Sequence, residues 1–118
     1  MTDPQALGRR WIDAWNERDL EAILEHYADD IEVRSPRVAE RFGTPDGRLQ
    51  GKARLREYFA LGLAKPDLRF DLVEVLEGPG TMTVVYRREN GALVADCSEL
   101  DSEGRITRMI ACYEAPSA

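Results

Sequence analysis

The first thirty-six residues constrain the fold more than any other part of this chain. Apolar side chains recur there twice at helical spacing, and each run follows an aspartate of the kind that caps a helix. A short strand-like run comes next and stops at Pro36. The sequence therefore predicts helices over about 4–17 and 20–28, followed directly by a strand over 31–35.

After Pro36 the pattern predicts a loop, one more helix and then only strands. Residues 37–50 contain two glycines and a proline without a clear period, which is typical of a long loop. Helical spacing returns between Gly51 and Pro66. Four further strands are predicted over 68–76, 81–89, 92–100 and 105–114. The order α-α-β-α-β-β-β-β places the chain in the α+β class.

Size and charge exclude several classes of protein. A chain of 118 residues is the size of one domain, so we treat 1–118 as a single domain. The net charge of −6 argues against a nucleic-acid partner, because phosphate binding needs a basic face. The chain has no apolar run long enough to cross a membrane, and its start lacks the features of a secretory signal. We therefore expect a cytoplasmic protein that binds neither nucleic acid nor membranes.

The cysteines and the histidine predict neither a metal nor a cofactor. Cys97 and Cys112 belong to no cluster of metal-site spacing, and we expect free, buried thiols rather than a disulfide. His26 lies one step off the apolar face of its predicted helix, which favours a surface position. The carboxylates complete no recognisable ligand set, and no glycine-rich phosphate loop occurs.

Basic residues gather between Arg34 and Arg56, where seven arginines and lysines accompany two acidic residues. Two interpretations stay open. The segment is either a solvated loop and helix face, or a positive rim that draws in an anionic ligand.

The opening of the chain resembles the nuclear transport factor 2-like superfamily, which includes SnoaL-like polyketide cyclases, ketosteroid isomerases and limonene epoxide hydrolases. The residues that carry this resemblance are Trp11-Ile12-Asp13-Ala14-Trp15-Asn16, Tyr27-Ala28-Asp29-Asp30 and Ile31-Glu32-Val33-Arg34-Ser35-Pro36. The resemblance implies a cone-shaped roll, in which a curved antiparallel sheet wraps three helices of the N-terminal half. Because this scaffold carries many chemistries, the function has to be argued from the pocket residues.

The predicted turn at Asn90-Gly91 assigns the two faces of the sheet. A two-residue turn there places Val85 opposite Asp96 on the face that meets the helices. The other face also holds large apolar residues, and in relatives the convex face often meets a second copy. We therefore expect a homodimer through Met82, Val84, Ile110 and their neighbours.

Asp96 is the strongest candidate for chemistry, since a carboxylate in an apolar cone is costly when it is charged and unpaired. It either pairs with Arg87, stays protonated and donates a hydrogen bond, or sits wet near the mouth. By resemblance, Asp96 corresponds to the oxyanion-hole aspartic acid of ketosteroid isomerases and Trp11 to the oxyanion tyrosine. The general-base aspartate corresponds to Ser35, which cannot take a proton from carbon without an adjacent base. Steroid isomerisation by the family route is therefore not expected.

The candidate catalytic residues are thus Asp96, Trp11 and Arg87. The predicted ligand pocket is completed by Trp15, Tyr27, Ser35, Phe42, Phe59, Val85, Ser98, Met109 and Tyr113. We expect the ligand to be a small apolar or amphipathic molecule that can carry a negative charge. Three hypotheses stay open. The protein is a SnoaL-like cyclase or isomerase acting on a hydrophobic cyclic or polyketide-like substrate, or a binding module without chemistry, or a dimeric interaction module whose cone is filled by its own aromatics.

Overall fold

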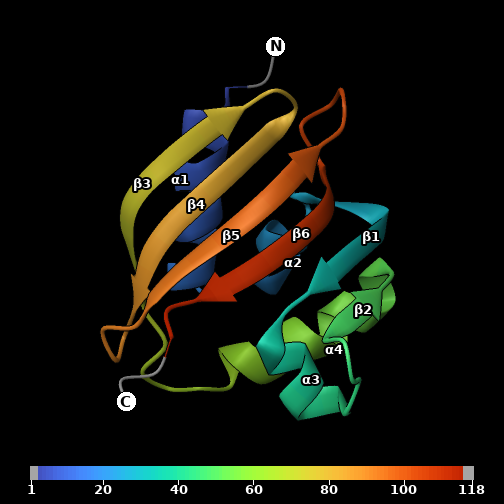
Figure 1. Ribbon diagram of the computed structural model, residues 1–118. Coiled ribbons are helices and arrows are strands. Elements are labelled where there is room, and N and C mark those ends of the chain that lie inside the picture. Colours follow the sequence, from blue (N-terminus) through green and yellow to red (C-terminus); the bar gives the residue numbers. More distant parts are fainter. Residues whose placement is uncertain (1–2, 116–118) are drawn as a thin grey trace.

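The structure is a computed structural model that describes residues 3–115 (Figure 1). Two helices come first, strands and helices then alternate up to α4, and four strands follow. The elements are α1 (Pro4–Asn16), α2 (Leu20–Leu24), β1 (Tyr27–Arg34), α3 (Pro36–Phe42), β2 (Arg48–Gln50), α4 (Lys52–Leu63), β3 (Phe70–Gly78), β4 (Thr81–Arg88), β5 (Leu93–Leu100) and β6 (Ile106–Tyr113).

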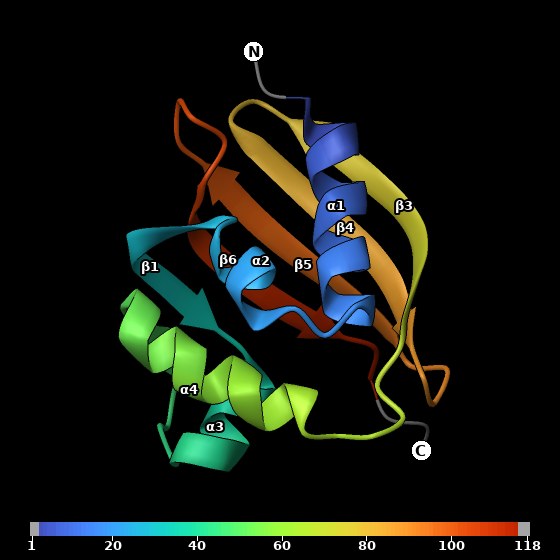
Figure 2. The same cartoon turned by 180° about the vertical axis from the view of Figure 1, so that it is seen from behind.

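The strands form one six-stranded sheet in the order β2-β1-β6-β5-β4-β3. All neighbours are antiparallel except β1 and β6, which run parallel. Figure 2 shows that α1, α2 and α4 lie against one face of the curved sheet, and Figure 1 shows the opposite face with no helix in front of it. The predicted α+β fold with a curved sheet around helices is confirmed, although one strand pair is parallel.

The first helix joins the sheet through both apolar and polar contacts. Asp3 caps α1 by accepting a hydrogen bond from the Gln5 amide, as its sequence position predicts. Trp11 and Trp15 on its inner face are only 2% and 5% exposed. At the end of α1, the Asn16 side chain both donates to and accepts from the backbone of Phe70, each time at 2.8 Å. These bonds hold the start of β3 beside α1.

The second helix is shorter than its apolar period predicts. It ends at Leu24, and residues 27–30, part of which we predicted as helix, belong to β1. The Ile106 amide donates to the His26 carbonyl at 2.7 Å, and Tyr27 pairs with Ile106. Pairing with β6 therefore takes over this segment, because tertiary contacts override a helical pattern only two turns long.

The predicted loop over 37–50 contains a helix, so that prediction is wrong. Ser35 caps α3 by accepting from the Arg37 amide, Pro36 occupies the first turn, and Gly43 ends the helix at a φ of 69°. The segment returns to the strand at Gly47, whose carbonyl accepts from the Ser35 amide at 2.9 Å. A Cβ at Gly47 would lie 2.5 Å from the Ser35 carbonyl oxygen, so the close approach requires glycine.

The turn between β4 and β5 is one residue longer than predicted. The Arg88 amide donates to the Ala92 carbonyl, and Gly91 has a φ of 86°, which is typical of a three-residue hairpin loop with glycine in the left-handed region. Asp96 consequently pairs with Val84 rather than Val85. Because one residue of shift turns every side chain of a strand to the other face, the predicted faces of β4 are exchanged.

Because the two faces of β4 are exchanged, each face of the sheet carries other residues than predicted. Met82, Val84 and Tyr86 lie in the core at 2–3% exposure, so they are not available to the dimer surface we predicted. The uncovered face instead carries Val85, Arg87 and the free, exposed Cys97 and Cys112, which we had predicted to be buried. Its exposed large apolar side chains are Val73, Leu76 and Ile110.

Candidate functional site

A cavity of about 60 Å³ lies between the helices and the inner face of the sheet. Its walls are largely aromatic: Trp11 and Trp15 come from α1, Phe59 from α4 and Phe70 from β3. These rings pack on one another, with Trp15 stacked on Phe70 at a centroid distance of 5.0 Å and in edge contact with Phe59 at 4.8 Å. The flat faces of these aromatic side chains suit a ring-shaped ligand.

Asp96 is the only carboxylate among the described residues that line this cavity. Its side chain comes from the middle of β5, and the residue is only 4% exposed. Oδ2 accepts a hydrogen bond from the Tyr86 hydroxyl at 3.0 Å, while Oδ1 is buried without a partner among the described residues. An acid with one free oxygen in an apolar wall can donate a hydrogen bond to a ligand when it is protonated.

Burial raises the pKa of Asp96 to about 7. The hydrogen bond from Tyr86 and the positive charge of Arg88 act in the opposite direction, but they offset only part of the cost of removing the carboxylate from water. Asp96 is therefore divided between its acid and its carboxylate near neutral pH, which is the condition for an efficient proton donor or acceptor.

The pair of Asp96 with Arg87, one of the three environments left open for Asp96, does not form. Arg87 is exposed on the opposite face of the sheet, where its guanidinium donates to the Gly91 carbonyl at 3.0 Å. Its neighbour Arg88 lines the cavity instead. The register of the hairpin decides this, because consecutive residues of β4 point to opposite faces.

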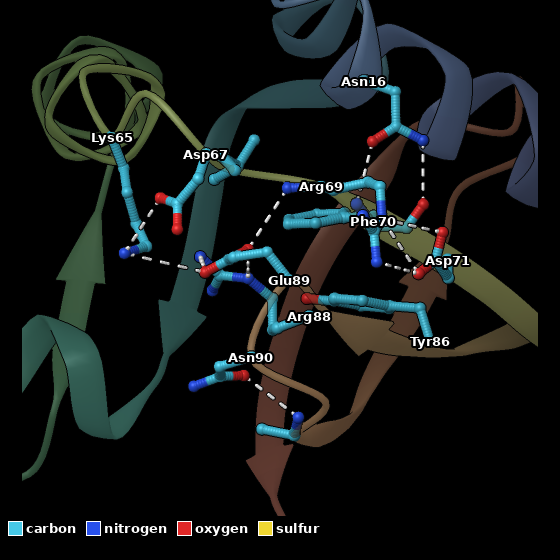
Figure 3. A network of polar contacts seen from close by, with 12 residues as sticks. Asn16, Lys65, Asp67, Arg69, Phe70, Asp71, Tyr86, Arg88, Glu89 and Asn90 are labelled. Carbon is cyan, nitrogen blue, oxygen red and sulfur yellow. Dashed lines mark hydrogen bonds and ion pairs between the residues drawn. The ribbon is translucent and has the colours of Figure 1, made fainter.

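Arg88 is held at the cavity by a buried acid (Figure 3). Its Nε lies 3.1 Å from Oε1 of Glu89, whose side chain is only 8% exposed, and its guanidinium lies 5.2 Å from the centroid of the Phe70 ring. Glu89 also accepts from the Arg69 amide at 3.2 Å. The charge of Arg88 is therefore neutralised within the protein.

The two indole N–H groups differ in what they can offer a ligand. Trp11, the predicted second donor, already donates to the Tyr27 hydroxyl at 2.8 Å, and Tyr27 approaches the Met109 sulfur at 3.7 Å. The Nε1 of Trp15 is buried without a partner among the described residues and belongs to the cavity wall. Trp15 is thus the tryptophan with a free N–H.

Ser35, which corresponds by resemblance to the general-base aspartate of ketosteroid isomerases, has a structural role here. Its hydroxyl accepts from the Arg37 amide at 3.2 Å and so caps α3. Ser35 also lines the cavity beside Tyr58 and Tyr113, where burial raises the pKa of both phenols, that of Tyr58 to about 12. No histidine or second carboxylate lines the cavity within residues 3–115.

The remaining predicted pocket residues divide into two groups. Phe59, Met109 and Tyr113 line the cavity together with Trp11, Trp15, Ser35 and Asp96. Four others do not: Tyr27 and Ser98 are buried behind the wall, Phe42 packs on Tyr58 at 6.0 Å, and Val85 lies on the uncovered face. His26 lines a separate shallow hollow, and its pKa is lowered mainly by burial.

Several residues of the site were not predicted from the sequence. Tyr86 and Arg88 were missed because the hairpin was predicted one residue too short. Arg37 and Arg41 were assigned to a loop, although the Ser35-Pro36 start signal and Gly43 enclose a helix that presents both on one face. Phe70 gave no signal beyond its apolar character.

The described residues contain no group of three or more histidine, cysteine, aspartate or glutamate side chains that could hold a metal ion. None of the helices within 3–115 is long and apolar enough to cross a membrane.

Comparison with solved structures identifies the scaffold. A SnoaL-like protein of unknown function from Burkholderia thailandensis E264 is 37% identical, with a TM-score of 0.91 over 95% of this chain and 94% of that one. A putative ketosteroid isomerase from Kribbella flavida DSM 17836 is 16% identical, with a TM-score of 0.73 over 98% and 80% of the two chains. TerC, co-crystallised with polyporic acid, is 20% identical with a TM-score of 0.75 over 95% and 92%. The two latter likenesses concern the fold alone.

No curated protein matches the chain. A match to the SnoaL-like domain extends over residues 8–113, which include every helix and strand except the first turn of α1. Together with the Burkholderia structure, this match shows that the chain belongs to the SnoaL-like domain family.

Proposed function

We propose that this protein binds a small, hydrophobic, ring-shaped molecule in the aromatic cavity and that Asp96 donates a hydrogen bond or a proton to an oxygen of that molecule. The observation that carries the proposal is the free, buried Oδ1 of Asp96 in an apolar wall. A polar atom that is buried without a partner costs free energy, and a bound carbonyl or hydroxyl group would remove that cost.

The chemistry that suits this site is acid catalysis at a carbonyl group. A protonated Asp96, positioned by the Tyr86 hydroxyl, can give its proton to the carbonyl oxygen of the ligand, and the carboxylate that results can take a proton from the neighbouring carbon, which converts a ketone into its enol. Its pKa of about 7 allows the same group to give up its proton and recover it near neutral pH. This supports a cyclase-type or isomerase-type enzyme acting on a cyclic ketone or enol.

A second candidate function is ligand binding without turnover. The observation that favours it is the use of Ser35 as a helix cap, which leaves the cavity wall without a carboxylate or histidine other than Asp96. If Asp96 acts only as a donor, nothing else in the described wall removes a proton from carbon near neutral pH.

A screen of cyclic ketones and phenols against wild type and Asp96→Asn separates the candidates. We expect a class of ring compounds to raise the melting temperature of the wild type. In the enzyme case Asp96→Asn retains weaker binding and loses turnover of those compounds by at least about 100-fold. Turnover that survives in Asp96→Asn contradicts a proton-transfer role. If no compound changes the melting temperature of the wild type, the proposed ligand pocket itself is contradicted.

A further inference from the structure

The helix α3 brings two arginines to the cavity, and neither of them pairs with a buried carboxylate among the described residues. Arg37 and Arg41 both line the cavity, and they lie one turn apart on α3. Arg37 approaches a carboxylate only at 4.0 Å, that of Glu40, whose side chain is 66% exposed. Arg41 forms no ion pair within residues 3–115. Arg88, in contrast, is neutralised by Glu89.

Two tyrosine rings hold these guanidinium groups in place. The Arg37 guanidinium lies 5.4 Å from the centroid of the Tyr113 ring, and that of Arg41 lies 5.7 Å from the centroid of Tyr58. Both tyrosines are themselves part of the cavity wall. The Arg37 side chain is 40% exposed, so the charges lie where the cavity opens to water, in contrast to the buried Asp96.

We propose that Arg37 and Arg41 form an anion subsite at the mouth of the cavity, so that the ligand is a single-ring carboxylate with a hydroxyl or carbonyl oxygen at its far end. This inference rests on the proposed function of the cavity and adds the class of its ligand. The ring lies between the aromatic walls, the carboxylate meets the arginines, and the far oxygen meets Asp96 and the free N–H of Trp15. Arginine suits the first task because its planar fork matches a carboxylate.

The cavity is open between Arg41 and Trp15. A Cβ built at Gly62 would lie 3.9 Å from both Arg41 Nη1 and Trp15 Cζ3, so α4 is bare of a side chain between these two groups. The cavity volume of about 60 Å³ is small. A cavity of this size favours a monocyclic ligand over a fused polycyclic one.

The charge pattern supports an anion rather than a neutral ligand. The chain as a whole carries a net charge of −6, yet its carboxylates are absent from the described cavity wall except for Asp96. Asp96 is protonated in part near neutral pH, so it repels an anionic ligand less than a fully ionised carboxylate would. A positive mouth on an acidic protein also attracts anions selectively to this one opening.

The test compares two probes of equal shape, 4-hydroxybenzoate and its neutral amide, 4-hydroxybenzamide. Binding to the full chain is followed by amide chemical shifts at pH 6 and low salt. We expect the carboxylate to bind at least about 10-fold more tightly than the amide, with both probes shifting residues of the cavity wall. The preference should disappear in the double variant Arg37→Gln, Arg41→Gln. It should persist in Arg34→Gln, which removes one positive charge from an exposed site outside the cavity wall.

Two further variants separate the ligand class from the pocket. Gly62→Leu should block both probes, since its side chain would enter the space between Arg41 and Trp15. Asp96→Asn should weaken both probes to a similar extent and leave the preference for the carboxylate in place.

Equal affinity for the two probes, or a preference that survives in the double arginine variant, overturns the anion subsite and leaves the ring pocket standing. Shifts confined to residues outside the cavity overturn it as well. If neither probe shifts a cavity residue at millimolar concentration, both the anion subsite and the proposed ring pocket are wrong.

Discussion

Replacing Asp96 by asparagine should make the protein more stable at high pH, by an amount that can be worked out from its pKa. The folded pKa of about 7 stands against an ordinary value of 3.8. Each pKa unit corresponds to about 1.4 kcal/mol, so deprotonation of Asp96 costs the folded state about 4 kcal/mol well above pH 7. Asparagine keeps the shape of the side chain, its carbonyl can accept from Tyr86, and it carries no titrating proton.

The sign follows from proton binding. Between pH 3.8 and about 7 the folded state holds the Asp96 proton and the unfolded state has lost it, so wild-type stability falls as the pH rises through this window. The free energy of unfolding of Asp96→Asn minus that of the wild type should therefore increase by about 3 kcal/mol between pH 5 and pH 9. Other titrating groups are common to both proteins and cancel in this difference.

Urea unfolding at a series of pH values measures the difference directly. Ser98→Ala is a matched control, because Ser98 is equally buried two residues further along the same strand face and has no proton that titrates in this range. Its difference from the wild type should be constant with pH. A constant difference for Asp96→Asn as well, or one that grows towards low pH, would refute the assignment of a buried, proton-holding acid.

Three other variants test the parts around Asp96. Tyr86→Phe removes a hydrogen bond that lowers the pKa of Asp96, so the midpoint of the same pH profile should move upward, and an unmoved midpoint would contradict the bond. Gly47→Ala places a Cβ against the Ser35 carbonyl at positive φ and should cost about 2 kcal/mol or more in chemical unfolding; a loss under about 0.5 kcal/mol would argue against the close approach. We propose a homodimer through the uncovered sheet face, so light scattering should give about twice 13.3 kDa for the wild type and a monomer for Ile110→Glu, whereas a monomeric wild type would end the proposal.

The sequence predicted those parts of the fold that depend on local periodicity and chain punctuation. Asp3 and Asp19 cap the first two helices as expected, and the third predicted helix is α4. The pairing of β1 with β6 could not be predicted in this way, since it joins residues about eighty positions apart. That long-range pairing is also what turns Tyr27 from a predicted helical residue into the first residue of a strand.

The prediction of the site depended on a single turn. A two-residue loop and a three-residue loop both suit Asn90-Gly91, and they send the side chains of β4 in opposite directions. Asp96 was placed correctly because its predicted position on one face with Met109 of β6 does not depend on the turn at Asn90-Gly91. Arg87 was chosen in place of Arg88, and Tyr86 was missed, because their strand carries apolar side chains on both faces and so gives no local signal of its register.

The central position of β6 in the sheet has a consequence for folding during synthesis on the ribosome. The strand that joins β1 to β5 comes after all the other described strands along the chain, so the two halves of the sheet cannot meet until β6 has left the exit tunnel. Until then β1 and β5 each expose an unpaired edge, which invites pairing with other nascent chains. The sheet is therefore completed only when β6 pairs with β1 and β5. A chain truncated before β6 would form an incomplete, aggregation-prone sheet rather than a smaller domain.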